Sequence, residues 1–278
     1  MNALGGYAML TIRDEDFDRL VRFIKSNYGI NLTHKRTLIE GRLSNIIMEK
    51  GFPGFTEYID YALGDQSGEE ISVLINRLTT NHTFFMREKS HFDYFQSRVL
   101  PYLAGTVKDH DLRIWSAGCS SGEEPYTLEM ILHDSFEREL ALWNTQILAT
   151  DISQRALGLA TKGEYPAESV ESLPPAWKLR YFEKQAGDAF RVREEIRRDV
   201  IFRTFNLMQR QYPFRRRFHV IFCRNVMIYF DQATKNELVR KFYEATEPGG
   251  YLFIGHSESI NRDQTGYRYI MPAVYRKQ

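Results

Sequence analysis

The chain has 278 residues, of which 43% are hydrophobic and 26% charged, and its formal net charge is +1. This composition is typical of a soluble globular protein with one large or two modest domains, and it provides no strong overall field for nucleic acid or anionic membranes. The only two cysteines, Cys119 and Cys223, are far apart in the sequence, which argues against a disulfide framework or a thiolate metal site. The absence of an apolar leader or of a membrane-spanning apolar run favours a cytoplasmic protein.

The first eighty residues have a helical pattern throughout. Apolar residues recur at helical spacing over Asp14–Tyr28, and Gly29 ends that segment. A second helix is expected from a Thr33 cap to Gly51, and two more at 55–62 and 69–78. We therefore expect an N-terminal helical domain at 1–80, followed by a linker at 81–90 that contributes to a site.

From residue 91 onward, strands and helices alternate, which predicts an α/β fold with a doubly wound, mostly parallel sheet over 91–278. Strands are expected at 111–116, 146–150, 199–205, 218–223 and 251–254, with helices between them, and Arg268–Arg276 as a closing edge strand. The long connection at about 163–198 contains Pro174-Pro175 and an alternating run, so we expect it to form a small inserted antiparallel β-subdomain.

Polar side chains follow the apolar strand at 218–222. Arg224 and Asn225 come directly after it, and Tyr229 follows within one turn. Because open α/β sheets bind ligands at the carboxyl ends of their strands, this cluster indicates a site.

The segment Trp115–Pro125 joins a strand to a helix through small residues. It contains neither Gly-x-Gly-x-x-Gly nor Gly-Lys-Ser/Thr, so pyrophosphate binding is poorly supported. The acids Glu123 and Glu124 at the helix start suit a cationic group such as an amino acid ammonium, although Glu123 is equally well explained as stabilising the helix N-terminus.

Two further strands also end in polar residues. Asp151 is placed either to accept ribose hydroxyls or to cap the next helix, and Asn206 with Leu207 either to contact a base or to form a turn. In the segment Thr79–Arg87, Arg87 is suited to orienting a carboxylate, with a solvated linker as the equally weighted alternative. Together these clusters outline a pocket for a nucleoside attached to an amino acid.

This combination resembles the CheR-type protein-glutamate O-methyltransferases, which modify chemotaxis receptors. The signatures that carry the resemblance are Thr79-Thr80-Asn81…Phe85…Arg87-Glu88, Trp115-Ser116-Ala117…Gly122-Glu123-Glu124-Pro125-Tyr126, Ala149-Thr150-Asp151-Ile152, Asn206-Leu207, Phe222–Asp231 (which contains Cys-Arg-Asn-Val-Met-Ile-Tyr-Phe) and Gly255-His256-Ser257-Glu258.

The resemblance implies S-adenosylmethionine as cofactor, S-adenosylhomocysteine as product, and glutamates on the cytoplasmic helices of chemoreceptors as substrate. It implies that the cofactor site is lined by Asn81, Thr83, Arg87, Glu124, Asp151, Asn206, Leu207, Arg224 and Asn225. Arg87 and Tyr229 are expected nearest the methyl group and the incoming carboxylate. A glutamate is already ionised at neutral pH, so neither a general base nor a metal is expected, and we expect a monomer without nucleic-acid binding or membrane insertion.

Two features depart from the family pattern. Members of the family often have a strongly basic second helix. In this chain the basic residues of that region are Lys35, Arg36 and Arg42, which we expect to dock the receptor. The loop Gln185–Ala189 is shorter than in members that hold a receptor C-terminal pentapeptide, so we expect weak or no pentapeptide binding.

Three alternatives remain open at this stage. The fold can serve as a catalytically weak cofactor sensor or scaffold, although Arg87 and Tyr229 argue against this function. Methylation of nucleic acid would require a basic face or an Asn-Pro-Pro-Tyr-like motif at the strand end that Arg224 and Asn225 occupy. The third alternative is a methyl acceptor in a sensory pathway outside motility.

Overall fold

The computed structural model describes residues 10–79 and 82–278 and divides the chain into two compact units. The helical unit contains the N-terminal part of the chain up to residue 81 together with Tyr229–Asp231. The sheet unit contains His82–Ile228 and Gln232–Gln278. The short segment Tyr229–Asp231 therefore belongs to the helical unit although its chain neighbours on both sides belong to the sheet unit.

The helical unit is built from α1 (Asp14–Tyr28), α2 (Arg36–Glu49), α3 (Phe55–Gly64) and α4 (Glu69–Leu78). As predicted, α1 ends at Gly29, which adopts a left-handed conformation with φ of 73°. The expected Thr33 cap is wrong: α2 begins at Arg36 with Lys35 at its N-cap position. The reason is a local turn in which the Asn31 side chain accepts hydrogen bonds from the backbone and hydroxyl of Thr33.

A seven-stranded sheet forms the sheet unit, with the order β6-β2-β1-β7-β8-β10-β9. Its strands are β1 (Ile114–Ala117), β2 (Ile147–Asp151), β6 (Val200–Thr204), β7 (Phe218–Cys223), β8 (Thr246–Ile254), β9 (Tyr267–Met271) and β10 (Val274–Lys277). The first five strands of this order pair in parallel, and β10 is antiparallel to both of its neighbours. This arrangement confirms the predicted mostly parallel sheet.

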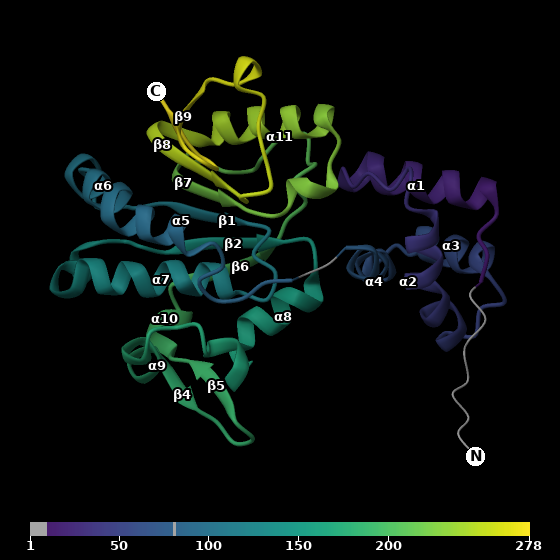
Figure 1. Cartoon of the computed structure of the whole chain (residues 1–278), viewed down its shortest axis with the longest axis horizontal. Helices are drawn as coiled ribbons and strands as arrows, with labels where there is room; N and C mark the ends of the chain where they lie inside the picture. The colour runs from purple at the N-terminus through teal and green to yellow at the C-terminus, as the bar shows by residue number, and fades with distance from the viewer. Residues whose placement is uncertain (1–9, 80–81) are drawn as a thin grey trace. The chain divides into compact units, whose positions relative to one another are not determined.

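Helices cover both faces of this sheet. Figure 1 shows α7 (Glu123–Phe136) on one side and α11 (Gln232–Ala245) on the other. The remaining helices of the unit outside the insertion are α5 (Lys89–Tyr94), which continues through a π-helical turn (Phe95–Val99) into α6 (Leu100–Thr106), and α8 (Gln154–Lys162). Every residue of β7 is buried, as expected for a central parallel strand covered on both faces.

The inserted subdomain is a second, three-stranded antiparallel sheet with the order β3-β5-β4. It comprises β3 (Glu164–Pro166), β4 (Phe182–Lys184) and β5 (Ala189–Val192), together with α9 (Pro175–Tyr181) and α10 (Glu194–Arg197). The predicted insertion of an antiparallel β-subdomain is thus confirmed.

The expectation of one closing strand over Arg268–Arg276 is wrong. The segment forms two antiparallel strands, and β9 rather than β10 is the edge of the sheet. Pro272, which has no N–H to donate to a ladder, and Ala273, with φ of 63°, form the turn between them.

Across residues 10–79 and 82–278, no helix combines the length and the apolar character that crossing a membrane requires.

Candidate active site

The carboxyl ends of four adjacent parallel strands bring the predicted polar residues to one edge of the sheet. Asp151 is the last residue of β2, and Arg224 follows the last residue of β7. Asn206 follows β6 by two residues, and the loop from Gly118 to Gly122 leaves β1. The paired strand registers place these positions beside one another at the edge where α/β sheets bind ligands.

Asp151 is fixed by backbone groups on both sides. Its Oδ2 accepts from the Ser120 amide at 2.8 Å, and its Oδ1 accepts from the Ser153 amide at 2.8 Å. Burial raises the pKa of this carboxyl, and the backbone donors act in the opposite direction. Ser153, and not Asp151, caps α8, because its side chain accepts from Ala156. Each Asp151 oxygen therefore keeps acceptor capacity for a further hydroxyl.

Arg224 is a buried cation between two carboxylates. Its side chain is 2% exposed and lies 2.9 Å from Glu124 Oε2 and 3.2 Å from Glu88 Oε2. It also donates to the Arg87 carbonyl. The other oxygen of Glu124 accepts from the Ser116 hydroxyl at 2.7 Å. These contacts tie the end of β7 to the start of α7 and to the segment that contains Arg87.

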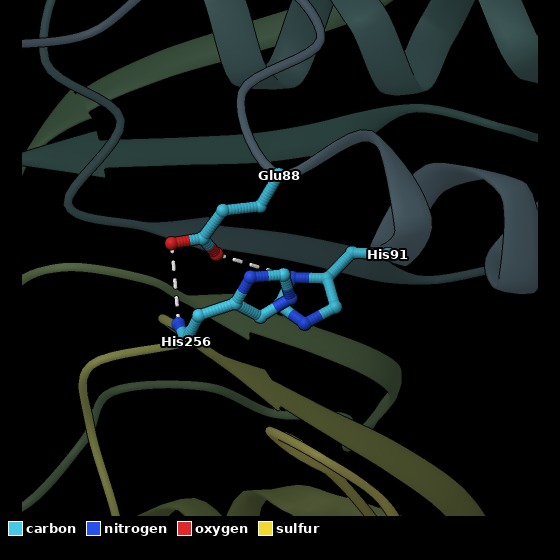
Figure 2. Close-up of side chains that lie close together, drawn as sticks. All are labelled: Glu88, His91 and His256. Atoms are coloured by element: carbon cyan, nitrogen blue, oxygen red, sulfur yellow. Dashed lines mark hydrogen bonds and ion pairs between the residues drawn. The ribbon is translucent and has the colours of Figure 1, made fainter.

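Glu88 connects a second set of groups. Its Oε1 accepts from the His256 amide at 3.1 Å, and its Oε2 lies 3.4 Å from His91 Nδ1 (Figure 2). The same Oε1 also accepts from Asn225 Nδ2 at 3.3 Å. Burial opposes ionisation of Glu88, but the Arg224 charge and these hydrogen bonds outweigh it and lower its pKa. Burial, together with Arg224, lowers the pKa of His91 to about 3, so that ring is neutral.

Glu258 holds the loop after β7 in place. Its carboxylate accepts from the backbone amides of Asn225 at 2.9 Å, Gly255 at 2.6 Å and Ile228 at 3.1 Å. The backbone of Asn225 has φ of 60°, a left-handed conformation that is uncommon for residues other than glycine. The hydrogen bonds to Glu258 support it. Glu88 and Glu258 occur in the sequence signatures, but no role was predicted for them, because Arg224 and Asn225, which they hold, lie far from them along the chain.

Two predicted residues lie in the segment before α5. Thr83 hydrogen-bonds with the buried Glu123 carboxyl, and Arg87 donates to the His82 carbonyl beside the Phe84 ring.

Two more predicted residues follow β6. Asn206 accepts from the Met208 amide at 2.9 Å, and Leu207 is buried. Asn81 lies outside the described residues. Tyr229 belongs to the helical unit, where its carbonyl accepts from Asn31 at 2.8 Å, so its role in catalysis stays a prediction.

The predicted docking residues lie in the helical unit. Lys35 is exposed. Arg36 pairs with Asp14 at 2.6 Å, and Arg42 donates to the carbonyls of 77–79 at the end of α4. These two guanidinium groups thus have intramolecular partners, and docking through them stays a prediction.

A buried hydroxyl without a hydrogen-bond partner among the described residues supports the binding of a ligand at the sheet edge. The Ser120 hydroxyl is buried and has no hydrogen-bond partner among the described residues, although its own amide holds Asp151. An orphaned hydroxyl beside a carboxylate with spare acceptor capacity suits a ligand that carries hydroxyl groups. The donor set therefore fits a nucleoside.

Comparison with known families agrees with this geometry. Residues 81–275 match the family described as "CheR methyltransferase, SAM binding domain", and residues 15–79 match "CheR methyltransferase, all-alpha domain". The chain belongs to the CheR methyltransferase family.

Curated relatives of the same family cover nearly the whole chain. A chemotaxis protein methyltransferase of Borreliella burgdorferi is 43% identical over 272 residues, which cover 96% of each chain. One from Escherichia coli K12 is 37% identical over 96% of this chain and 92% of its own. The resemblance predicted from the sequence is confirmed, and as a family member the chain is a methyltransferase with S-adenosylmethionine as its cofactor.

When bound, this cofactor supplies a methyl group made electrophilic by its sulfonium sulfur. The chain itself supplies an acceptor for paired hydroxyls at Asp151 and a carboxylate at Glu124 that Ser116 and Arg224 orient. We expect these groups to hold the cofactor, and the rigid ion-pair network behind them to preserve their geometry.

Proposed function

We propose that this CheR methyltransferase is a protein-glutamate O-methyltransferase that esterifies glutamate side chains on the cytoplasmic helices of chemotaxis receptors. The observation that carries the proposal is the Glu88–Arg224–Glu124 network, which joins the Arg87 segment to the cofactor edge of the sheet. The names of the chemotaxis methyltransferases of Borreliella burgdorferi and Escherichia coli support chemotaxis as the setting.

The chemistry needs little from the protein beyond alignment. A free glutamate has a pKa of about 4.3 and is already a nucleophile at neutral pH. The enzyme has only to position the carboxylate in line with the methyl group and to exclude water. We assign Arg87 to orienting that carboxylate, because a guanidinium forms a planar fork that matches it, and Tyr229 to the same reaction.

The site assignments belong to the same proposal. The residues that we place around the cofactor are Asn81, Thr83, Arg87, Glu124, Asp151, Asn206, Leu207, Arg224 and Asn225, with S-adenosylhomocysteine as the product. We infer that the division into 1–80, 81–90 and 91–278, with the insertion at about 163–198, separates receptor contact from methyl transfer. A cytoplasmic location follows from the cytoplasmic helices of the substrate.

The test is to incubate the protein with methyl-labelled S-adenosylmethionine and a chemoreceptor signalling fragment, and then to add base. Because carboxyl methyl esters hydrolyse in base, volatile labelled methanol is the expected product. Cofactor binding by calorimetry without volatile label would favour a sensor or scaffold, or a methyl acceptor outside motility. Loss of cofactor binding as well would contradict the proposal entirely.

A further inference from the structure

A second group of titratable side chains lies away from the candidate active site. Glu129 and His133 belong to α7, and Asp199 immediately precedes β6. One ligand atom of each residue lies within 4.8 Å of those of the other two. Because Asp199 comes before the first residue of its strand, this group lies at the amino end of the sheet, opposite the cofactor edge.

The spacing of the first two residues suits a shared metal ion. Residues four apart lie one above the other on one helix face. His133 Nε2 lies 3.4 Å from Glu129 Oε1, which is long for a hydrogen bond to a carboxylate. Ligands of a tetrahedral zinc ion at about 2.0–2.1 Å are about 3.3 Å apart, so the observed separation matches one edge of that tetrahedron.

One polar atom of each residue in this pair is buried without a hydrogen-bond partner among the described residues. The Glu129 side chain is fully buried, and its Oε2 and the His133 Nε2 have no hydrogen-bond partner within the described part of the chain. The Thr145 hydroxyl reaches Glu129 Oε1 only at 3.5 Å. A buried carboxyl with so few donors is costly, and a bound cation would offset that cost.

The third ligand gives the group access to solvent. The Asp199 side chain is 25% exposed and that of His133 is 10% exposed. The Arg198 guanidinium lies 3.5 Å from Asp199 Oδ2, but its side chain is 66% exposed and is free to turn outward when a cation arrives.

We propose that Glu129, His133 and Asp199 form a binding site for a zinc-class divalent cation that links α7 to the start of β6. The donor set is one imidazole nitrogen and two carboxylates, which suits Zn²⁺ better than Ca²⁺ or Mg²⁺, whose ligands are oxygen atoms. Three protein ligands leave a fourth position for water. The site acts on the stability of the sheet unit and is separate from methyl transfer.

A second group of this kind among the described residues, Glu88, His91 and His256, does not favour a cation. Arg224 already pairs with Glu88, and its side chain is 2% exposed, so an added ion would face a buried positive charge. This group supplies the matched control.

The experiment is a calorimetric titration of the full chain with ZnCl₂, together with thermal unfolding with and without zinc. We expect one ion per chain and a higher Tm in zinc. Glu129→Gln, His133→Gln and Asp199→Asn should each weaken binding by at least about tenfold and remove the zinc-dependent rise in Tm. His256→Gln should bind zinc like the parent chain.

Asp199→Asn is the variant least prone to misfolding, because its side chain is the most exposed of the three. Absence of saturable zinc binding by the parent chain would overturn the proposal. Binding that Asp199→Asn leaves unchanged, or that His256→Gln abolishes, would overturn it equally.

Discussion

Arg224 keeps the candidate site rigid through its two ion pairs. A buried guanidinium is tolerated only while its charge is balanced, and here two carboxylates balance it. Neutralising one of them removes charge-assisted hydrogen bonds from a guanidinium that water does not reach.

We therefore predict that Glu88→Gln lowers the free energy of unfolding by roughly 1–3 kcal/mol, because the amide keeps the shape but not the charge. Denaturant unfolding measures this loss. The matched control is Asp93→Asn, which breaks the exposed pair with Lys89 and should change stability by less than about 0.5 kcal/mol. Equal effects of the two substitutions would contradict a special role for Glu88.

Substitution of Arg87 is expected to affect turnover and cofactor binding to different extents. We predict that Arg87→Ala lowers kcat more than it weakens cofactor affinity, since the guanidinium is assigned to the incoming carboxylate. Turnover comes from the base-labile methanol assay, and affinity comes from calorimetry. Equal losses in both would make Arg87 a cofactor ligand only.

Tyr229→Phe tests the tyrosine hydroxyl separately. Unchanged turnover of this variant would remove the hydroxyl from the mechanism.

His219 provides a pH dependence that is independent of catalysis. This residue is buried in β7, and its Nδ1 accepts from the Arg113 amide at 3.1 Å. Burial first, and the Arg113 charge second, lower its pKa from 6.5 to about 4, against the opposing effect of the acids Glu247, Asp109 and Asp111. Between these two values the unfolded chain binds a proton that the folded chain does not, so stability is lost as pH falls through this window.

We predict that His219→Asn, which keeps an acceptor but does not titrate, loses less stability than the parent chain on acidification. A shift of this size corresponds to at most about 3 kcal/mol between pH ~6.5 and pH ~4. Urea unfolding at a series of pH values measures it. Parallel pH profiles for the two proteins would show that His219 is not responsible.

The loop between β1 and α7 depends on a glycine at residue 118. Gly118 has φ of 92°, and an added Cβ would lie 2.4 Å from a methyl carbon of Val226 in the loop after β7. Gly158 in α8 has nothing within 4 Å of the same position.

We predict that Gly118→Ala costs about 1–3 kcal/mol of stability and weakens cofactor binding, because the loop also supplies the Ser120 amide to Asp151. Gly158→Ala should instead be neutral or stabilise by up to about 1 kcal/mol. Adding Val226→Ala to Gly118→Ala should recover only part of the loss, since it relieves the contact but not the backbone strain. Full recovery would contradict the strain.

Sequence patterns predicted the elements best where local chemistry decides them. The bounds of α1 and β7 are as expected, because a helical apolar period ends at a glycine and a continuous apolar run ends at a polar pair. The errors at Thr33 and at the β9–β10 turn arose where a short-range hydrogen bond or a proline outweighed the periodic pattern.

Local sequence pattern also predicted part of the candidate site. Polar residues at strand ends, such as Asp151 and Arg224, can be identified from the sequence because the apolar pattern of the strand predicts where the strand ends. No role was predicted for Glu88 and Glu258, because the contacts of Glu88 with Arg224 and of Glu258 with Asn225 join residues more than 20 positions apart, which only the folded sheet brings close.

The helical unit contains a segment from the distant part of the chain, Tyr229–Asp231. Ile30 forms an antiparallel bridge with Phe230, the Asn31 amide donates to the Tyr229 carbonyl at 2.8 Å, and Lys25 pairs with Asp231 at 2.7 Å. The segment that contains the predicted catalytic tyrosine is therefore anchored to the unit expected to meet the receptor.

The β4–β5 hairpin bears on how the receptor is recruited. The β4–β5 hairpin closes through residues 185–188, with left-handed backbone at Gly187 and Asp188 and a 2.7 Å hydrogen bond from Gln185 to Ala189. So short a hairpin offers a peptide little surface beyond a three-residue edge strand. We predict that receptor fragments with and without their C-terminal five residues are methylated with kcat/KM values within about twofold, since tethering would otherwise raise the effective concentration. Rates from the methanol assay on the two fragments measure this, and micromolar binding of the isolated pentapeptide by calorimetry would contradict it.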